Sequence, residues 1–298
     1  MKKFPLVSIV IPTFNRINFL KETIESCKLQ TIECEIIVVD HGSNDGTKEY
    51  FQNIKETNIQ YIRKEKDHGP IYAWLDGLLH ASYELVHLQF DDDIIKPNFI
   101  EKCVSLLSED VGFVFCAANL MDEKSNLLPK KMYSDLFTTG KHRSNKIKKF
   151  ALHKMISPAC TLMRKQDILD SLYIGKLPFQ KYTYHGVGPD LYMMLLAISR
   201  YQNFAYINEA LVIFREHSSS ITSQSHLDKT KMFNLQKSYD EVRKFFLIVS
   251  LQKNFIFKLY IFMSLINLKN LYFLLNKIKN PKWQKLLDSL KKQYKKNN

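Results

Sequence analysis

The residues best suited to chemistry are Asp91, Asp92 and Asp93, which directly follow the apolar run 85–90. This run is rich in Leu, Val and Phe, and it predicts a buried strand that ends where the carboxylates begin. Three adjacent carboxylates repel one another and suit a core poorly, so a divalent cation is their natural partner. The alternative is a solvated acidic turn that caps a helix after Pro97, and the residues before position 85 argue against it.

Three further strand-like runs precede the triplet and alternate with helical patterns. The strands are expected at 6–11, 35–39 and 59–62, and the helices at 19–29, 47–51 and 71–82. Strands that alternate with helices at this spacing predict right-handed βαβ units and a parallel sheet. Ligands of such sheets bind at the carboxyl ends of the strands, which is where the three aspartates fall.

Glycine-rich phosphate loops are absent from the sequence. Neither a GxGxxG after the first strand nor a GxxxxGK[ST] pattern occurs. A bound phosphate would therefore be held mainly by metal and side chains, and an ordinary dinucleotide site is not expected.

The composition narrows the class of protein. A chain of 298 residues with 45% hydrophobic content can bury a full core. Its net charge is +13, but eleven lysines against one acid give +10 within 253–298, so the body is nearly neutral and no nucleic-acid partner is expected. The start of the chain shows no signal-peptide pattern and the five cysteines are scattered, so we expect a cytoplasmic protein with free thiols.

The C-terminal part differs in character from the rest. We expect a catalytic domain at 1–225 and a basic, aromatic-rich helical extension at 226–298. The longest charge-free stretch in 245–275 is 259–268, far short of the roughly 20 residues that span a bilayer. Two interpretations stay open: peripheral binding to an anionic membrane surface, or helices that pack on the catalytic domain or on a second copy in a homo-oligomer.

Several ordered motifs resemble those of family 2 glycosyltransferases with the GT-A fold. They are Val-Ser-Ile-Val-Ile-Pro-Thr-Phe-Asn-Arg at 7–16, Ile-Val-Val-Asp-His-Gly-Ser-Asn-Asp-Gly-Thr at 37–47, Asp-His-Gly-Pro at 67–70 and the aspartates at 91–93. The resemblance covers roughly residues 5 to 220. It implies an α/β fold with a mixed, mainly parallel sheet flanked by helices and followed by a C-terminal helical extension. It also implies an inverting transferase that uses a nucleotide-sugar donor and Mn²⁺ or Mg²⁺.

The resemblance assigns roles at the matching positions. Asp91 and Asp93 match the ends of the DxD metal motif, with Asp92 alternative or supporting. Asp40 would accept a hydrogen bond from the base, and Thr13 and Asn15 would line the base and ribose. His217 in the closing motif would complete the metal shell, and Arg215 would neutralise the leaving diphosphate. The other donor-binding candidates are Pro12, Arg16, Asp67 and Gly69.

Asp190 precedes the apolar helical segment 191–198. Local pattern alone makes it a helix cap. The family places its general base at this position, and displacement at an anomeric carbon needs a carboxylate that takes the acceptor's proton. Asp190 is therefore the candidate base. Three residues depart from the family pattern: Pro189 replaces a Glu, His41 replaces an acid, and Trp74 begins a pair that replaces Arg-Asn.

The sequence thus predicts a metal-dependent inverting glycosyltransferase. The donor is expected to be a UDP-sugar, and the acceptor a hydroxyl of a glycan or lipid-linked glycan in surface polysaccharide or lipooligosaccharide synthesis. A catalytically degenerate, membrane-associated scaffold subunit and a sugar nucleotidyltransferase are the alternatives. The lysine-rich stretch 124–149 is expected to be a solvated insertion or a loop over the active site.

Overall fold

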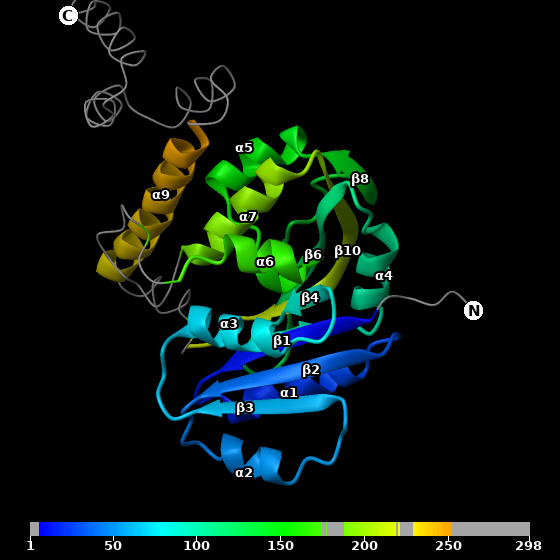
Figure 1. The fold of residues 1–298 in the computed structure, drawn as a ribbon, viewed down its shortest axis with the longest axis vertical. Helices are drawn as coiled ribbons and strands as arrows, with labels where there is room; N and C mark the ends of the chain where they lie inside the picture. Colours follow the sequence, from blue (N-terminus) through cyan, green and yellow to red (C-terminus); the bar gives the residue numbers. More distant parts are fainter. Residues whose placement is uncertain (1–5, 175–176, 178–187, 219, 221–228, 252–298) are drawn as a thin grey trace, which may run out of the picture. The chain divides into compact units, whose positions relative to one another are not determined.

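The computed structural model describes residues 6–174, 177, 188–218, 220 and 229–251 (Figure 1). The chain divides into two compact units, 1–244 and 245–298. The expected boundary between residues 225 and 226 stays a prediction, and the apolar stretch 259–268 lies outside the described residues. Within the described part, no helix is long and apolar enough to cross a membrane.

The N-terminal half of the first unit is a parallel sheet, as predicted. Its strands lie in the order β3-β2-β1-β4, and every neighbouring pair is parallel. They are β1 (Val7–Thr13), β2 (Cys34–His41), β3 (Ile59–Lys64) and β4 (Leu85–Leu88). The β-branched runs of β1 and β2 are almost wholly buried, which is typical of strands covered on both faces.

Helices cover both faces of these strands (Figure 1). The connections are α1 (Ile17–Lys28), α2 (Thr47–Gln52) and α3 (Pro70–His80), with α3 on the side opposite α1 and α2. Helix α3 packs tightly on the sheet through Gly77, where an added Cβ would lie 2.3 Å from Val10 Cγ1. The close approach requires glycine at this point of the helix.

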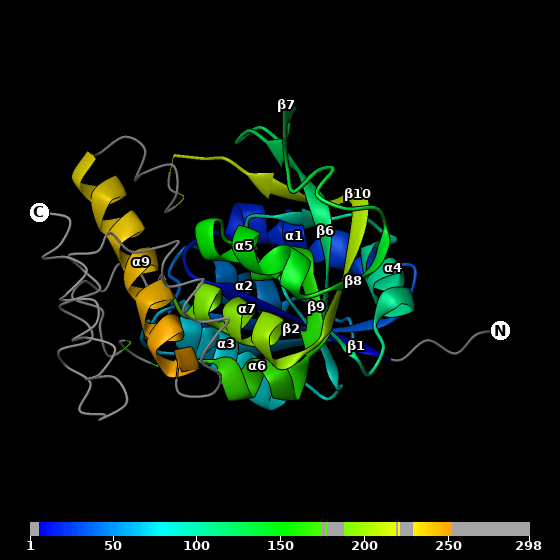
Figure 2. The same ribbon diagram turned by 90° about the horizontal axis from the view of Figure 1, so that it is seen from above.

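The C-terminal half extends the same sheet and makes it mixed. Strand β9 (Thr161–Arg164) pairs antiparallel with β4 and with β6 (Val111–Met121), and β6 pairs parallel with β10 (Asn203–Arg215). The two-residue strand β5 (Ile94–Ile95) pairs with β10. The remaining described α-helices are α4 (Phe99–Leu106), α5 (Asn145–His153), α6 (Lys165–Ser171), α7 (Pro189–Arg200) and α9 (Lys229–Leu251), and Figure 2 shows α5, α6 and α7 grouped together.

The stretch 124–149 is largely solvated, as one alternative expected, but it is not a loop. Strand β7 (Leu127–Met132) pairs with β6, strand β8 (Gly140–Arg143) pairs with β10, and α5 begins at Asn145. The side chains of β7 are largely exposed, so backbone hydrogen bonds to β6 hold this strand in place. Its sequence therefore lacks the alternation of apolar and polar residues that predicts a half-buried strand.

Candidate active site

The three aspartates lie directly after β4, at the carboxyl edge of the parallel strands. Backbone pairing continues past β4, because Gln89 N donates to Val10 O at 2.9 Å. Asp91, Asp92 and Asp93 are only 6%, 8% and 3% exposed. The acidic-turn alternative would leave these carboxylates in solvent, and the structure does not.

The end of β1 supplies two donors to these carboxylates. Thr13 Oγ1 donates to Asp91 Oδ2 at 2.9 Å. One nitrogen of Arg16 donates to Asp91 Oδ1 at 3.0 Å and to Asp92 Oδ2 at 2.6 Å. Two of the predicted donor-binding residues, Thr13 and Arg16, therefore lie in direct contact with the triplet.

The end of β10 closes the triplet from the other half of the chain. Arg215 N donates to Asp93 Oδ1 at 2.9 Å, and His217 Nε2 lies 2.9 Å from Asp92 Oδ2. The Arg215 side chain is fully buried and donates to Asp92 O at 3.0 Å and to Glu22 at 2.7 Å. Through these contacts Arg215 holds Asp92 and Asp93 in position. The predicted contact of Arg215 with a diphosphate stays a prediction.

Three ionised carboxylates would be unfavourable in this buried place, because they repel one another. Burial raises the pKa of Asp91 to about 6, and the Asp92 charge adds to this while the Arg16 guanidinium opposes it. Burial, followed by the Asp92 charge, raises the pKa of Asp93 well above its ordinary value. Neighbouring positive charge would favour the ionised forms.

Asp40, at the end of β2, is completely buried. Its Oδ1 accepts from Ser43 N at 2.8 Å, and its Oδ2 accepts from Tyr61 at 2.5 Å and from Arg63 at 2.6 Å. The sequence pattern did not single out Tyr61 or Arg63. Tyr61 and Arg63 lie two residues apart in β3, so their side chains share one face of the strand beside the end of β2. This spacing is the sequence signal that could have identified them.

Asn15 joins the loops that follow β1 and β2. It holds a left-handed backbone, with φ of 53°. Asn15 N donates to Ser43 Oγ at 2.8 Å, and its Oδ1 accepts from Asn44 N at 2.8 Å. The preceding Pro12 lies opposite Val39 in the β1–β2 pair. Pro12, Asn15 and Asp40 therefore belong to one connected edge of the sheet.

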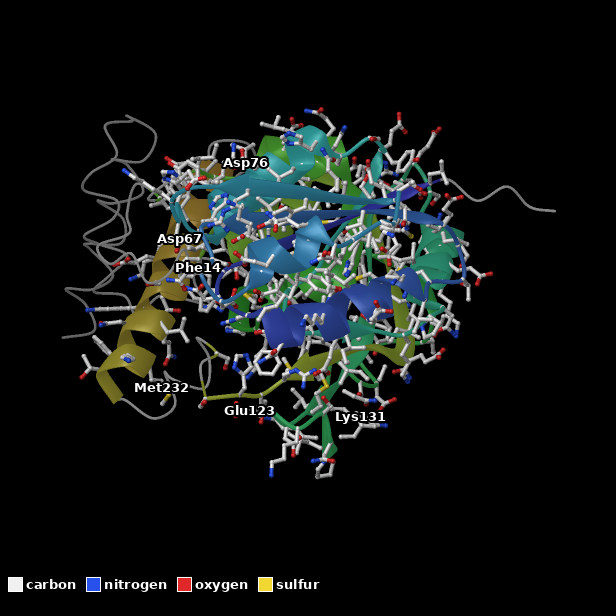
Figure 3. All side chains as sticks on the ribbon, turned by 90° about the horizontal axis from the view of Figure 1, so that it is seen from below. Phe14, Asp67, Asp76, Glu123, Lys131 and Met232 are labelled. Carbon is white, nitrogen blue, oxygen red and sulfur yellow. The ribbon has the colours of Figure 1, made fainter. Side chains whose placement is uncertain are left out.

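Asp67 and Gly69 lie in the loop between β3 and α3. Asp67 Oδ1 accepts from Gly69 N at 2.7 Å, and Gly69 takes a φ of +88° just before α3 begins at Pro70. Figure 3 shows Asp67, together with Phe14, at the end of the sheet where β1 to β3 finish. This loop thus belongs to the same edge as the aspartates.

Asp190 is the second residue of α7, and Gly188 occupies the cap position. Its Oδ1 accepts from Gly188 N at 3.0 Å and from Leu191 N at 2.8 Å, and Tyr239 donates to Oδ2 at 3.4 Å. Burial raises the pKa of Asp190 despite these hydrogen bonds. Among the described residues, no hydrogen bond joins Asp190 to the three aspartates.

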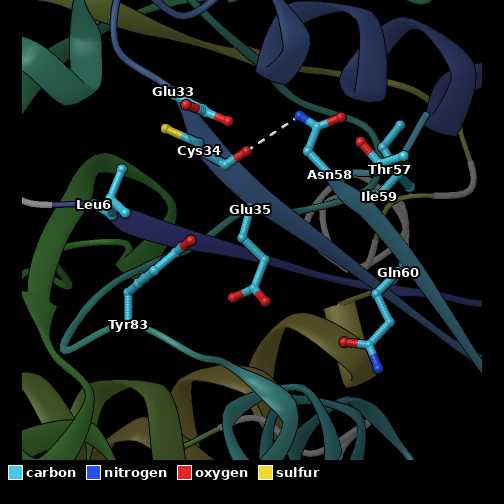
Figure 4. Close-up of a pocket in the computed structure, with 9 residues that line it drawn as sticks. All are labelled: Leu6, Glu33, Cys34, Glu35, Thr57, Asn58, Ile59, Gln60 and Tyr83. Carbon is cyan, nitrogen blue, oxygen red and sulfur yellow. Dashed lines mark hydrogen bonds between the residues drawn. The ribbon is translucent and has the colours of Figure 1, made fainter.

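A hollow of about 480 Å³ lies at the opposite, amino edge of β1, β2 and β3 (Figure 4). Its lining consists of Leu6, Glu33, Cys34, Glu35, Thr57, Asn58, Ile59, Gln60 and Tyr83. Glu35 is already engaged there by Ser8 and Ser82. The hollow holds no cluster of buried carboxylates, and the carboxyl edge remains the better candidate site.

Comparison with known proteins agrees with this arrangement. Residues 8–171 match the model of glycosyl transferase family 2. The chain belongs to this family. An uncharacterized glycosyltransferase of Rickettsia typhi is 31% identical over 228 residues, which cover 74% of this chain and 66% of that protein. The GalNAc(5)-diNAcBac-PP-undecaprenol beta-1,3-glucosyltransferase of Campylobacter jejuni is 33% identical over 131 residues, covering 43% and 42%.

The fold is that of GT-A glycosyltransferases. The crystal structure of residues 1–349 of S. aureus TarS in complex with UDP-GlcNAc superposes with a TM-score of 0.57 at 16% identity, covering 80% of this chain and 71% of that one. The expectation of a mixed, mainly parallel GT-A sheet is confirmed.

GT-A glycosyltransferases often use a divalent metal, which raises the question whether the aspartates at 91–93 could bind one. Among the described residues, no group of three His, Cys, Asp or Glu side chains is arranged to ligate a metal. Mg²⁺ needs only one or two carboxylates when phosphates and water complete its shell. Asp93 Oδ2 accepts no hydrogen bond from the described residues, whereas Thr13 and Arg16 already donate to both oxygens of Asp91. Carboxylate oxygens are the type of donor that Mg²⁺ and Mn²⁺ take, so the chemistry of these side chains suits such an ion.

Proposed function

We propose that this chain transfers a sugar, with inversion, from a nucleotide-sugar donor to an acceptor hydroxyl. The observation that carries the proposal is the convergence of Asp91, Asp92 and Asp93 with the ends of β1 and β10 at the carboxyl edge of the sheet. Burial raises the pKa values of Asp91 and Asp93, and a positively charged ligand in that place would favour their ionised forms. Membership of glycosyl transferase family 2 supports the reaction class.

The donor is a UDP-sugar in this proposal. Asp40 accepts a hydrogen bond from the base, and the Tyr61 and Arg63 donors hold its carboxylate in one orientation. Thr13 and Asn15 line the base and ribose, and the neighbouring Pro12 shapes the same wall. The complex of S. aureus TarS with UDP-GlcNAc supports a uridine nucleotide.

Asp91 and Asp93 would hold Mn²⁺ or Mg²⁺, and His217 would assist. When bound, the ion stabilises negative charge that develops on the leaving diphosphate. The chain itself contributes the fixed donors around the carboxylates: Arg16 binds Asp91 and Asp92, and Arg215 N orients Asp93. Asp67 and Gly69 contact the nucleotide from the loop before α3.

Asp190 takes the proton of the acceptor hydroxyl as the new glycosidic bond forms. A carboxylate that acts as a base should have a raised pKa and a fixed orientation, because proton affinity and geometry both limit the rate. Burial raises the pKa of Asp190, and hydrogen bonds from Gly188, Leu191 and Tyr239 orient it.

The acceptor is a glycan or a lipid-linked glycan of surface polysaccharide or lipooligosaccharide synthesis. Support comes from the Campylobacter jejuni relative, whose name specifies an undecaprenol-linked acceptor. We place the enzyme in the cytoplasm, with the lysine-rich segment 253–298 binding an anionic membrane surface.

Nucleotide-dependent thermal stabilisation tests this proposal. UDP, GDP, dTDP and CDP are each added with and without Mn²⁺ to the wild type, to Asp93→Ala and to Glu109→Ala, an exposed acid, as the matched control. A ligand of the folded state raises the melting temperature by mass action. We expect a Mn²⁺-dependent shift with UDP that Asp93→Ala loses and Glu109→Ala keeps. No shift with any nucleotide would refute the proposal and favour a scaffold role.

A further inference from the structure

We propose that His41 is a positioning residue that fixes the donor loop, defined as residues 65–69. The proposal rests on the proposed function, in which Asp67 and Gly69 of this loop contact the nucleotide. His41 is the last residue of β2, directly after Asp40, and it is 2% exposed. A buried polar ring at the edge of a ligand site requires partners, and the two ring nitrogens have different ones.

The partner of His41 Nδ1 is the backbone of the donor loop. His68 N donates to Nδ1 at 3.4 Å. Among the described residues, this is the hydrogen bond that ties the donor loop to a side chain of the sheet. The loop also lies against the residue after His41, since a Cβ on Gly42 would meet Glu65 O at 3.0 Å.

The partner of His41 Nε2 is Asp76 of α3, whose Oδ2 lies 3.2 Å away. Lys64 Nζ, at the end of β3, lies 3.4 Å from the other oxygen of Asp76. An amide N–H can only donate, so Nδ1 must be the acceptor and the ring proton must sit on Nε2, facing Asp76. Asp76 thereby selects the tautomer that can hold His68.

These contacts form a chain from α3 through His41 to the donor loop. The family resemblance implies an acid at position 41, and a carboxylate there would face Asp76 and repel it. The ring instead accepts from the loop and donates to the helix. Loss of the Nδ1 acceptor frees the loop backbone without touching Asp40 or the aspartates at 91–93.

Two isosteric variants separate the two nitrogens. In His41→Asn, the side-chain oxygen can stand in for Nδ1 and keep the bond to His68. In His41→Gln, the amide reaches the position of Nε2 and keeps Asp76 but loses the loop. His80→Asn is the control, because His80 contacts the backbone of Asp76 on the exposed side of α3 and does not contact the loop.

Two readouts test the proposal on the full-length protein. Backbone hydrogen exchange of residues 65–69 is measured without nucleotide, and the Kd for UDP with Mn²⁺ is measured by calorimetry. One lost hydrogen bond predicts about 5-fold weaker UDP binding and faster exchange in His41→Gln. His41→Asn and His80→Asn should match the wild type within about 2-fold in both readouts, a difference below the energy of one hydrogen bond.

Unchanged exchange in His41→Gln, or faster exchange with unchanged UDP affinity, would overturn the proposal. Equal losses in His41→Asn and His41→Gln would also overturn it, because they would indicate a packing role. Should His41→Gln fail to fold, Asp76→Ala removes the group that selects the tautomer and should give the same weakening. A wild type that binds no nucleotide refutes the proposed function, and hydrogen exchange then still decides whether His41 holds the loop.

Discussion

Replacement of Asp91 by Asn should stabilise the protein at neutral pH when divalent cations are absent. Burial raises the pKa of Asp91 from 3.8 to about 6 in the folded state, so ionising this carboxyl opposes folding. At about 1.4 kcal/mol per pKa unit, the upper limit of that cost is about 3 kcal/mol. The raised pKa already includes the ion pair with Arg16, but the amide group of Asn must face Thr13 or Arg16, which donate to both carboxylate oxygens. We therefore expect a gain of about 1–3 kcal/mol, or several degrees in melting temperature.

The gain should depend on pH in a defined direction. A carboxyl with a raised folded pKa binds its proton more tightly in the folded state, so its penalty is absent below about pH 4 and complete above about pH 7. Urea unfolding with EDTA at pH 4.5, 6.0 and 7.5 measures this difference between Asp91→Asn and the wild type. The gap should be roughly a third of its full size at pH 4.5, nearly complete at pH 6.0 and little larger at pH 7.5.

Asp45→Asn provides a control of opposite sign. Burial would raise the pKa of Asp45, but hydrogen bonds from Thr47 and from Ile17 N outweigh it and lower the pKa. Removing this charge should destabilise the protein at pH 7.5. A less stable Asp91→Asn at pH 7.5, or a gain that does not change with pH, would refute the electrostatic reasoning. Mn²⁺ should stabilise the wild type and leave Asp91→Asn unchanged.

Three further outcomes are expected. Asp190→Asn should lose sugar transfer while keeping the Kd for UDP, as measured by product formation and calorimetry. Tyr239→Phe removes a hydrogen bond that lowers the pKa of Asp190, so this pKa should rise further. The carboxylate is then protonated at a higher pH, and the acid limb of the pH–rate profile should move to higher pH. Gly77→Ala should cost about 1–3 kcal/mol in urea unfolding, because its Cβ must displace Val10 in the core.

The parallel half of the fold was predictable because its signal is local. The short runs at 6–11 and 35–39 are rich in Ile and Val, which favours buried strands. The polar residues that follow each run then meet at one edge of a parallel sheet. That geometry alone brings Thr13 and Asp91 together. The exposed strand 127–132 was missed because backbone pairing, which leaves no side-chain pattern, holds it on β6.

The supporting residues of the site were not predictable in the same way. Arg215 is 122 residues from Asp93, and its contact with that carboxylate runs through a backbone N–H. Glu22 of α1 accepts a hydrogen bond from the same arginine, but the helical pattern marks Glu22 only as a surface residue. Such contacts depend on which elements pack together, and no spacing within either segment encodes them.

The structure gives the three adjacent aspartates different surroundings. Asp92 Oδ2 is held from one side by Arg16 at 2.6 Å and from the other by His217 at 2.9 Å, so this carboxylate joins the two halves of the chain. Burial raises the pKa values of Asp91 and Asp93, and the charge of Arg16 does not fully offset it. We therefore expect a cation that binds here to be held by Asp91 and Asp93, while the contacts of Asp92 with Arg16 and His217 hold the loop that presents them.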